Sequence, residues 1–306
     1  MSLDTRKKDF EMFQDEIFDK ISPLIVSSKI NKKLLNSFNN SVIKYLSKSA
    51  TNSYKLKSEK SIINFYDRNI DKLNFITPNG AVVPKKETAE EFNLITKIFI
   101  KIIKSLNIQS NIVRFHIPLN IRVKFSNIPS SYYLRDRATE KPHSDSWAGE
   151  SSNCVNFHIP IFGDVDNNKM EFFYPKKLNE NWLRPLKNFQ TGFKYKKYYK
   201  RLNFKTSKGN LIISDFATLH RTIRKKNCKT RVSLDTTFEI KRTNKFSISK
   251  IHKDRKNEYI SFKKYEKLGD KNKYYFSDSI FNLINQDKGF KHFANFRIVK
   301  NEKYKS

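Results

Sequence analysis

Three potential metal ligands limit the folds that this chain can adopt: His143 and Asp145 lie two residues apart, and His220 lies far downstream. In an extended segment residues i and i+2 point to the same side, so His143 and Asp145 can reach one ion while Ser144 faces away. His220 ends an apolar run that starts at Gly209, as a buried strand would. Two imidazoles and one carboxylate are the ligands of an open-faced Fe(II) site. The spacing therefore predicts a β-structure that brings two distant segments to one metal.

A further strand-like segment, Arg231 to Phe238, follows the second histidine. Its β-branched residues and alternating character are typical of a strand. Arg231 and Ser233 are again two residues apart, so a guanidinium group and a hydroxyl group can converge on one carboxylate. The pattern predicts an anion-binding pair on this strand.

Together these segments resemble the core of the Fe(II)/2-oxoglutarate-dependent dioxygenases, closest to their phytanoyl-CoA-hydroxylase-like branch. That superfamily carries a His-x-Asp motif, a later His, and an Arg on the following strand. The resemblance implies that His143, Asp145 and His220 bind Fe(II), and that Arg231, with Ser233, binds the distal carboxylate of 2-oxoglutarate. It covers roughly residues 110–240. The fold that it implies is mainly β with helical flanks, built on a double-stranded β-helix (jelly-roll, cupin-like) core.

The resemblance also implies an activity. Enzymes of this kind use Fe(II), 2-oxoglutarate and O2 to hydroxylate an unactivated C–H bond, and they release succinate and CO2. Asp145 stands where related halogenases have a small residue, which favours hydroxylation, while desaturation, epoxidation and ring closure stay open. Two alternatives remain: a nucleic-acid-directed oxygenase or demethylase, and a cupin-like binding protein that has lost catalysis.

Each of these residues also has an ordinary structural interpretation. A His-x-Asp pair on a loop is commonly a solvated pair or a cap. His220 could bond a carbonyl at the edge of the core, and Arg231 could pair with Asp235 or Asp215. Because all of these interpretations would have to hold together, the metal site is favoured.

Two segments that flank the metal motif are expected at the mouth of the site, Ser131–Arg137 and Ser146–Glu150. Their Tyr, Trp and Arg side chains suit a polar or anionic small molecule, such as a sugar, an amino acid derivative or a natural-product intermediate. The candidate substrate-binding residues are Tyr133, Arg135, Arg137, Trp147 and His158. Ordinary packing is the alternative for each, and a hydrogen-bonded core position is the alternative for His158.

The chain is expected to form a single domain in three parts: a helical flank (1–110), the β-helix core (110–240) and a basic, aromatic-rich C-terminal extension (241–306) that packs over the barrel. Helices are predicted at Phe10–Ile25 and Asn31–Leu46. A third is predicted from Thr88, where Thr88-Ala89-Glu90-Glu91 has the pattern of a capping box before an apolar stripe at helical spacing. The acidic turn Gly163–Asn168 predicts a hairpin.

Composition bears on the partners. The net charge of +31 would suit phosphate binding. However, the lysines are spread along the chain, and abundant Asn, Ile, Phe and Tyr suggest AT-rich coding sequence. We therefore expect a small-molecule substrate rather than nucleic acid, although the basic and aromatic segment Lys194–Arg201 could stack bases.

The chain carries no pattern for secretion or membrane insertion. Its two cysteines, Cys154 and Cys228, build no disulfide framework, which favours a reducing compartment. No apolar stretch reaches the length of a membrane span, and the N-terminus lacks the apolar region of a signal peptide. A cytoplasmic protein without membrane contact is expected.

Overall fold

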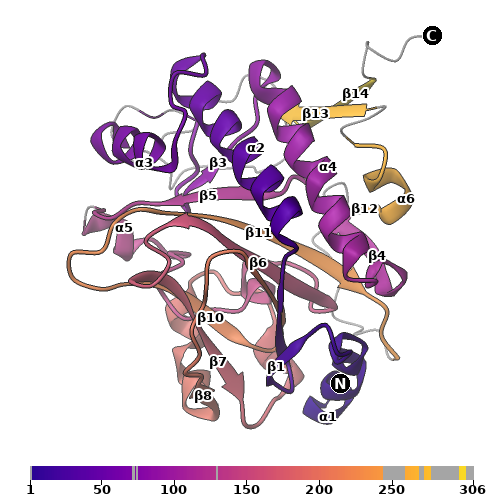
Figure 1. Ribbon diagram of the computed structural model, residues 1–306. Coiled ribbons are helices and arrows are strands. Elements are labelled where there is room, and N and C mark those ends of the chain that lie inside the picture. Colours follow the sequence, from indigo (N-terminus) through magenta and orange to yellow (C-terminus); the bar gives the residue numbers. More distant parts are fainter. Residues whose placement is uncertain are drawn as a thin grey trace.

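The computed structural model describes residues 2–70, 73, 75–128, 130–243, 259–268, 272–276 and 296–300. Within them the strands form a sheet of nine strands, one of three and one of two. Helices cover one face of the largest sheet (Figure 1). The expectation of a mainly β fold with helical flanks is confirmed.

Most of the helices lie in the first third of the chain, and most of the strands follow them. The helices are α1 (Leu3–Phe10), α2 (Lys32–Thr51), α3 (Glu59–Arg68), α4 (Ala89–Ser105), α5 (Ser131–Leu134) and α6 (Phe262–Tyr265). The strands are β1 (Asp19–Ser22), β2 (Ile25–Lys29), β3 (Ala81–Val82), β4 (Ile112–His116), β5 (Asn120–Lys124), β6 (Cys154–Gly163), β7 (Asn168–Pro175), β8 (Tyr199–Arg201), β9 (Asn210–Asp215), β10 (Leu219–Arg224), β11 (Arg231–Ile240), β12 (Tyr259–Ser261), β13 (Asn272–Phe276) and β14 (Phe296–Lys300). Two 3-10 segments contain or contact the residues of the candidate site described below: η5 (Asp145–Ala148) and η7 (Phe189–Tyr198).

The central strands alternate between two facing sheets. In the large sheet β9, β6, β11 and β5 lie side by side and run antiparallel. In the small sheet β8, β7 and β10 are neighbours, and the segment Thr139–His143 joins β10 through a bridge between His143 and His220. The chain therefore passes back and forth between the sheets: from β5 to the Thr139–His143 segment, back to β6, across to β7 and β8, back to β9, across to β10 and back to β11. This winding is a double-stranded β-helix, as expected.

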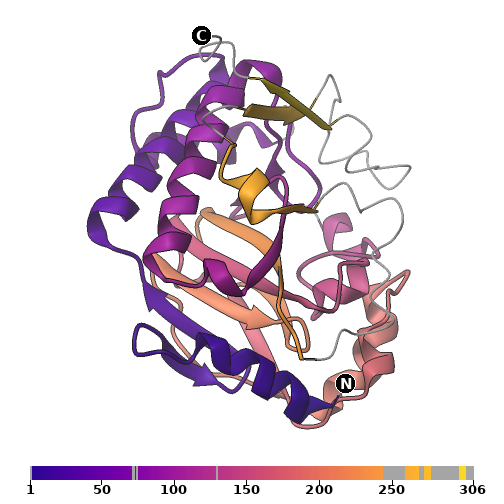
Figure 2. The ribbon, with the colours of Figure 1, turned by 90° about the vertical axis from the view of Figure 1, so that its right-hand side faces the viewer.

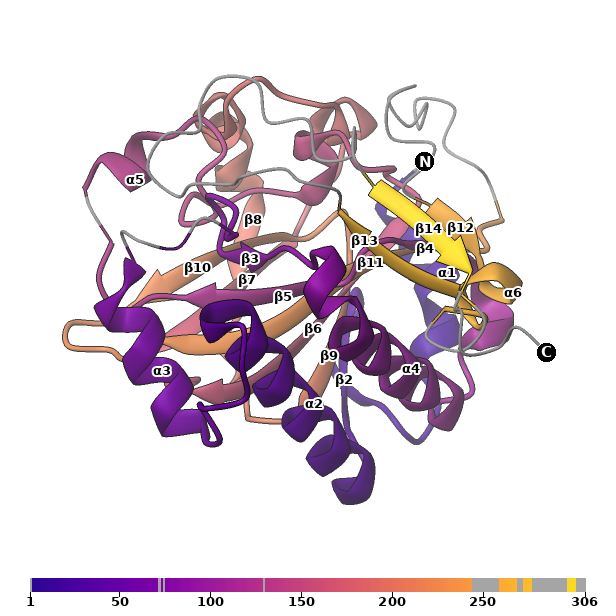
Figure 3. The same cartoon turned by 90° about the horizontal axis from the view of Figure 1, so that it is seen from above.

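The large sheet has one apolar face and one polar face because side chains alternate along each strand. On β11, Val232, Leu234 and Phe238 belong to the main hydrophobic core together with residues of α2 and α4. These two helices lie side by side on that face (Figures 1 and 3). The alternate residues Arg231, Ser233 and Asp235 point to the other side, into the space between the two sheets. The interior of the β-helix is therefore polar along β11, whereas Ile212 of β9 packs with Met170 and Phe172 of β7 in a separate apolar cluster.

The N-terminal part differs from its prediction at one helix. α1 ends at Phe10, a short 3-10 segment (Glu11–Phe13) follows, and the chain then forms β1 and β2, so the prediction of a helix over 10–25 is wrong. Pro23 cannot donate a hydrogen bond within a helix, and β2 instead pairs with β9, with Ile25 opposite Ser214. The helix predicted from Asn31 is confirmed: Asn31 accepts hydrogen bonds from the N–H groups of Lys33 and Leu34 at the start of α2.

The helix predicted after Thr88 is also confirmed, but its cap is not. α4 begins at Ala89, and its apolar stripe is buried. The Thr88 hydroxyl makes no cap hydrogen bond; it accepts from the Lys85 N–H at 3.1 Å and closes the preceding 3-10 turn. A hydroxyl that faces back to this turn cannot reach the third N–H of the helix, so the capping-box prediction is wrong.

The acidic turn at the end of β6 connects the two sheets. β6 pairs with β11 and β9, whereas β7 pairs with β10 and β8, so the prediction of a hairpin at this turn is wrong. The turn residues themselves behave as expected, since Asp164 accepts hydrogen bonds from the N–H groups of Asn167 and Lys229. Gly163 has a φ of +87°, which favours glycine at this corner.

The described parts of the C-terminal extension contribute one strand to the edge of the large sheet and a separate two-stranded sheet, β13 with β14. β12 pairs with β4, and α6 lies beside it (Figure 2). Tyr265 of α6 is fully buried and stacks on Phe115, with ring centroids 4.4 Å apart. His252 and His292 lie outside the described residues. Among the described helices, none is long and apolar enough to cross a membrane.

Candidate metal centre

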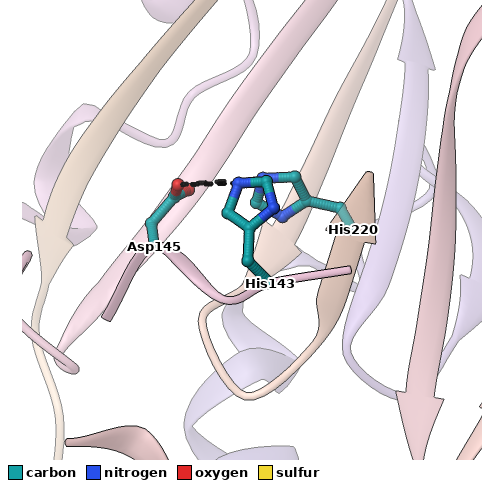
Figure 4. A group of neighbouring side chains, drawn as sticks. All are labelled: His143, Asp145 and His220. Atoms are coloured by element: carbon teal, nitrogen blue, oxygen red, sulfur yellow. Dashed lines mark ion pairs between the residues drawn. The ribbon is translucent and has the colours of Figure 1, made fainter. Parts of the chain in front are cut away.

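Three side chains from two segments converge between the sheets (Figure 4). His143 and Asp145 come from the chain that enters η5, and His220 comes from β10. Their candidate ligand atoms all lie within 4.8 Å of one another. Asp145 Oδ1 is 3.7 Å from His220 Nε2 and 4.0 Å from His143 Nε2. This group can hold a metal ion on one face and leave other coordination positions open.

Backbone pairing brings the two histidines together. The His143 N–H donates to the His220 carbonyl at 2.9 Å, and the His220 N–H donates to the His143 carbonyl at 2.8 Å. Ser144 faces away from the group, as the i, i+2 spacing predicted, and its hydroxyl donates to the Phe216 carbonyl at 2.6 Å. That bond connects the His-x-Asp segment to the turn before β10, so both ligand segments share one support.

Hydrogen bonds select the atom that each ligand presents. His143 Nδ1 lies 2.7 Å from the Lys141 carbonyl and must donate to it, which leaves the Nε2 lone pair free. Asp145 Oδ2 accepts a hydrogen bond from Asn156 Nδ2 at 2.7 Å, which leaves Oδ1 toward the histidines. The His143 ring also stacks on Phe189 at a centroid distance of 4.5 Å. The ligands are thus oriented by the protein itself.

Burial sets the charge states of the ligands. It lowers the pKa of His143 to about 3 and that of His220 to about 4, so both imidazoles are neutral near pH 7. Burial raises the pKa of Asp145, although its carboxylate is also bonded by Asn156. Neutral imidazole is the form that binds a metal, and a bound cation would favour the ionised carboxylate. The donor set therefore fits a divalent transition metal.

Arg231 lies on the inner face of β11 and is only 1% exposed. Its Nε and one terminal nitrogen are buried without a hydrogen-bond partner among the described residues. The two carboxylates considered as its partners are engaged elsewhere: Asp235 binds Arg122, and Asp215 binds Arg6 and Arg242. Burial lowers the pKa of Arg231 to about 9. A buried guanidinium group without a protein anion is an obvious binding site for a ligand anion.

Ser233 and His158 share this interior. Ser233 is 1% exposed and lies two residues from Arg231 on the same face of β11. His158 on β6 is 2% exposed, and both of its ring nitrogens are buried without a partner. Burial lowers the pKa of His158 well below its usual value, and the charges of Arg231 and His220 lower it further. His158 therefore lies near both the metal group and the buried arginine.

The other candidate substrate residues differ in their burial and contacts. Trp147 is fully buried in a separate hydrophobic cluster with Phe173, Phe189, Tyr199 and Leu219, and its indole N–H donates to the Trp182 carbonyl at 2.5 Å. Tyr133 is 41% exposed. Arg135 donates to the Tyr132 carbonyl and to Asn79, and Arg137 donates to the Leu186 carbonyl.

The structure adds polar residues that the sequence analysis did not assign. Asn156 holds the outer oxygen of Asp145. Lys124 on β5 is 4% exposed and reaches across to the small sheet, where its Nζ donates to Thr139 Oγ1 at 2.7 Å. The available signal was the Arg122-x-Lys124 spacing in a strand-like run, which places two cations on one face.

Comparisons with known proteins give structural likenesses only. No protein-family profile matches the chain, and no curated protein matches it. Among solved structures, the chain is similar to the non-heme alpha-ketoglutarate-dependent carbocyclase SnoK from nogalamycin biosynthesis, with 10% identity, a TM-score of 0.45 and coverage of 76% of this chain and 83% of SnoK. The epimerase SnoN of the same biosynthesis has 10% identity to this chain and a TM-score of 0.39, and the match covers 70% of this chain and 76% of SnoN. An N-substituted L-amino acid dioxygenase from Burkholderia ambifaria has 9% identity and a TM-score of 0.37, and the match covers 75% of this chain and 85% of the dioxygenase. The fold assignment rests on the strand order and registers of the chain itself.

Proposed function

We propose that this protein is an Fe(II)- and 2-oxoglutarate-dependent dioxygenase that hydroxylates a small polar or anionic molecule and releases succinate and CO2. The observation that carries the proposal is a pair of groups in one interior. The His143, Asp145 and His220 triad faces the same space as Arg231, a buried guanidinium group that forms no ion pair with the described residues. A 2-oxo dicarboxylate has one end that can chelate a metal and another that can bind an arginine.

The residues have separate roles in this proposal. His143, Asp145 and His220 would hold Fe(II), which when bound supplies the activation of O2. Arg231 would bind the distal carboxylate of 2-oxoglutarate through a two-pronged, charge-assisted contact, and Ser233 would add a hydroxyl donor. Asn156 keeps Asp145 Oδ1 directed to the metal by holding Oδ2. His158, which is buried near both groups, would contact the substrate.

The similar structures include an epimerase, a carbocyclase and an amino acid dioxygenase, and the proposed reaction rests on the residues of this chain. We propose hydroxylation because Asp145 occupies the acidic ligand position, where a small residue would admit a halide. The substrate is proposed to enter from the side of Tyr133, Arg135 and Arg137, which lie in the loop before the metal motif.

Metal binding is the first test. His143→Ala and His220→Ala should each abolish stoichiometric binding of Fe(II), or of Co(II) as a spectroscopic substitute, while circular dichroism stays that of the folded protein. His116→Ala is the matched control, because His116 is also a buried histidine but lies on β4 outside the triad. Retention of tight, stoichiometric metal by both triad variants would contradict the assignment.

Turnover is the second test. The Fe(II)-loaded protein should release succinate from 2-oxoglutarate under O2, and a metabolite library should include compounds that accelerate the release and gain one oxygen atom. A cupin-like binding protein without catalysis would bind the metal but give no succinate with any compound. Accelerated release by single-stranded nucleic acid alone would favour the alternative of a nucleic-acid oxygenase.

A further inference from the structure

The interior of the β-helix contains a second cation that the proposed mechanism has not used. Lys124 lies on β5, and the backbone register places it directly opposite Arg231 of β11. Residues directly opposite in an antiparallel pair point to the same face, with Cβ atoms about 4.5–5.5 Å apart. Both side chains are buried, at 4% and 1% exposure. Two cations therefore start from neighbouring positions on the inner face of the large sheet.

The two arginines near this pair, Arg122 and Arg224, each bind a carboxylate. Arg122, two residues before Lys124, is paired with Asp235, and Arg224 of β10 is paired with Glu140 at 2.9 Å. Neither Lys124 nor Arg231 has an ion-pair partner within the part of the chain that the structure describes. The one side-chain partner of Lys124 there is the neutral Thr139 hydroxyl. Glu140 is the carboxylate that favours the charged form of Lys124, but it is already bound by Arg224. Several buried cations that share so little negative charge are unfavourable, so the arrangement is suited to a ligand that brings negative charge.

We propose that Lys124 is a second cationic anchor for the distal carboxylate of the dicarboxylate co-substrate, opposite Arg231. The inference rests on the proposed function, and it adds a binding residue from a different strand. Arg231 offers a planar fork, whereas Lys124 offers a compact point charge that can approach the same carboxylate from the side of β5. Thr139 holds the ammonium group in place, because its hydroxyl accepts from Nζ.

The electrostatics agree with this role. Burial lowers the pKa of Lys124 well below its usual value, and the neighbouring Arg122, Arg224 and Arg231 lower it further, while Glu140 opposes them. A carboxylate bound between Lys124 and Arg231 would favour the charged ammonium form. Binding of a dicarboxylate should therefore be accompanied by uptake of a proton, which calorimetry in buffers of different ionisation enthalpy detects.

The experiment measures binding rather than turnover. 2-Oxoglutarate is titrated into the anaerobic Fe(II) protein, and the metal-to-ligand charge-transfer absorption gives the midpoint. Lys124→Met should raise the midpoint roughly 10- to 100-fold, the loss expected for a charge-assisted contact. Lys226→Met is the matched control: it removes the same charge from an exposed turn between β10 and β11 and should leave the midpoint unchanged.

A shortened ligand makes the test specific for the distal carboxylate. 2-Oxobutyrate keeps the metal-chelating end but lacks that carboxylate, so Lys124→Met should change its midpoint by less than about twofold. The ligand-free Lys124→Met variant should also be at least as stable as the wild type in urea, because an apolar side chain of similar length replaces a buried amino group whose charged form is disfavoured. Lys124→Gln provides a second variant that keeps a polar contact with Thr139 and should weaken binding in the same way.

The outcomes separate this inference from the proposed function. A wild-type protein that binds metal but gives no absorption change with 2-oxoglutarate contradicts the proposed function itself. Normal wild-type binding with an unchanged midpoint in both Lys124 variants overturns the inference alone. Equal weakening for 2-oxoglutarate and 2-oxobutyrate also overturns it, since Lys124 would then act on the shape of the site and not on the distal carboxylate.

Discussion

At the scale of single residues, Arg231 decides whether the metal centre belongs to a 2-oxoglutarate enzyme. The triad alone suits several kinds of iron protein, but a buried guanidinium group with unpartnered nitrogens requires an anion. The same burial that lowers its pKa makes the contact with a carboxylate strong, since little water competes for it. In the proposed function, the choice of co-substrate therefore depends on a residue outside the candidate metal triad.

Truncation of Arg231 should separate metal binding from co-substrate binding. Loss of such a charge-assisted pair typically costs about 2–5 kcal/mol. Arg231→Ala should raise the 2-oxoglutarate midpoint roughly 30-fold to several thousand-fold, at about 1.4 kcal/mol for each decade, with Fe(II) affinity nearly unchanged. Ser233→Ala should do the same more mildly, because one hydroxyl adds a single hydrogen bond.

The same anaerobic titration checks both variants. Arg184→Ala, which removes an exposed arginine, is the control and should behave as the wild type. An unaltered midpoint in Arg231→Ala would mean that the co-substrate is anchored elsewhere in the interior.

The two histidine ligands predict a pH dependence for the metal-free protein. Their folded-state pKa values are lowered to about 3 and about 4, whereas an unfolded histidine titrates near its usual 6.5. Between pH 4 and 6.5 the unfolded chain binds more protons than the folded protein. The free energy of unfolding therefore decreases as the pH drops below 6.5 and increases as the pH rises again. The slope is about 1.4 kcal/mol per pH unit for each histidine.

Urea midpoints at pH 7, 6 and 5 measure this slope. The double variant His143→Gln/His220→Gln should show a flatter dependence than the wild type over the same range. Equal slopes in the two proteins would show that the histidines titrate normally in the folded state.

At the scale of elements, the 3-10 segment η7 supports the metal ligands from outside the β-helix. Its Phe189 stacks on the His143 ring, and its Gly192 lies against Trp147, two residues beyond Asp145. A Cβ atom at Gly192 would approach the Trp147 ring to 2.4 Å. Because Trp147 is fully buried in a packed cluster, the ring has little room to shift.

Gly192→Ala should therefore disturb the segment that carries Asp145. Overpacking of this kind typically costs about 1–3 kcal/mol of stability, and we expect weaker metal binding together with a lower melting temperature. Tryptophan fluorescence and a Co(II) titration would measure the two effects. Gln190→Ala, an exposed change in the same segment, is the control; a Gly192→Ala protein with normal metal affinity and stability would contradict this view of η7.

At the scale of the whole molecule, a buried ionic network joins the N-terminus to the end of the core. Asp215, at the end of β9, accepts hydrogen bonds from Arg6 of α1 and from Arg242 after β11, each at 2.6 Å. All three side chains are fully buried, and Arg242 also lies 3.5 Å from Asp9. Asp215 precedes the turn that leads to His220, so this network connects three distant parts of the chain beside the metal centre.

Removal of the shared carboxylate should destabilise the whole domain. Asp215→Ala leaves two buried arginines without their main anion, which typically costs about 3–5 kcal/mol. Asp166→Ala, which breaks an exposed pair with Lys205, should cost less than about 1 kcal/mol. Urea unfolding of both variants measures the difference. Equal midpoints for the two would show that the network contributes no more than a surface ion pair.

The sequence by itself determined the polar pattern of the site. His143, Asp145, His220 and Arg231 were recognisable because i, i+2 spacing and strand-ending positions are local properties of the chain. The helices after Asn31 and Thr88 were predictable for the same reason, since helical periodicity and start signals lie within one segment.

Only the tertiary structure decided which segments pair and which charges stay without partners. The acidic turn after β6 has local hairpin chemistry, yet its strands belong to different sheets. The chain around Ile25 becomes a strand because β9 offers it an edge. Lys124 meets Arg231 through strand register, and the engagement of Asp235 and Asp215 by other arginines leaves Arg231 free for a ligand. Pairing across long stretches of sequence depends on the global packing of the sheets, which no local pattern encodes.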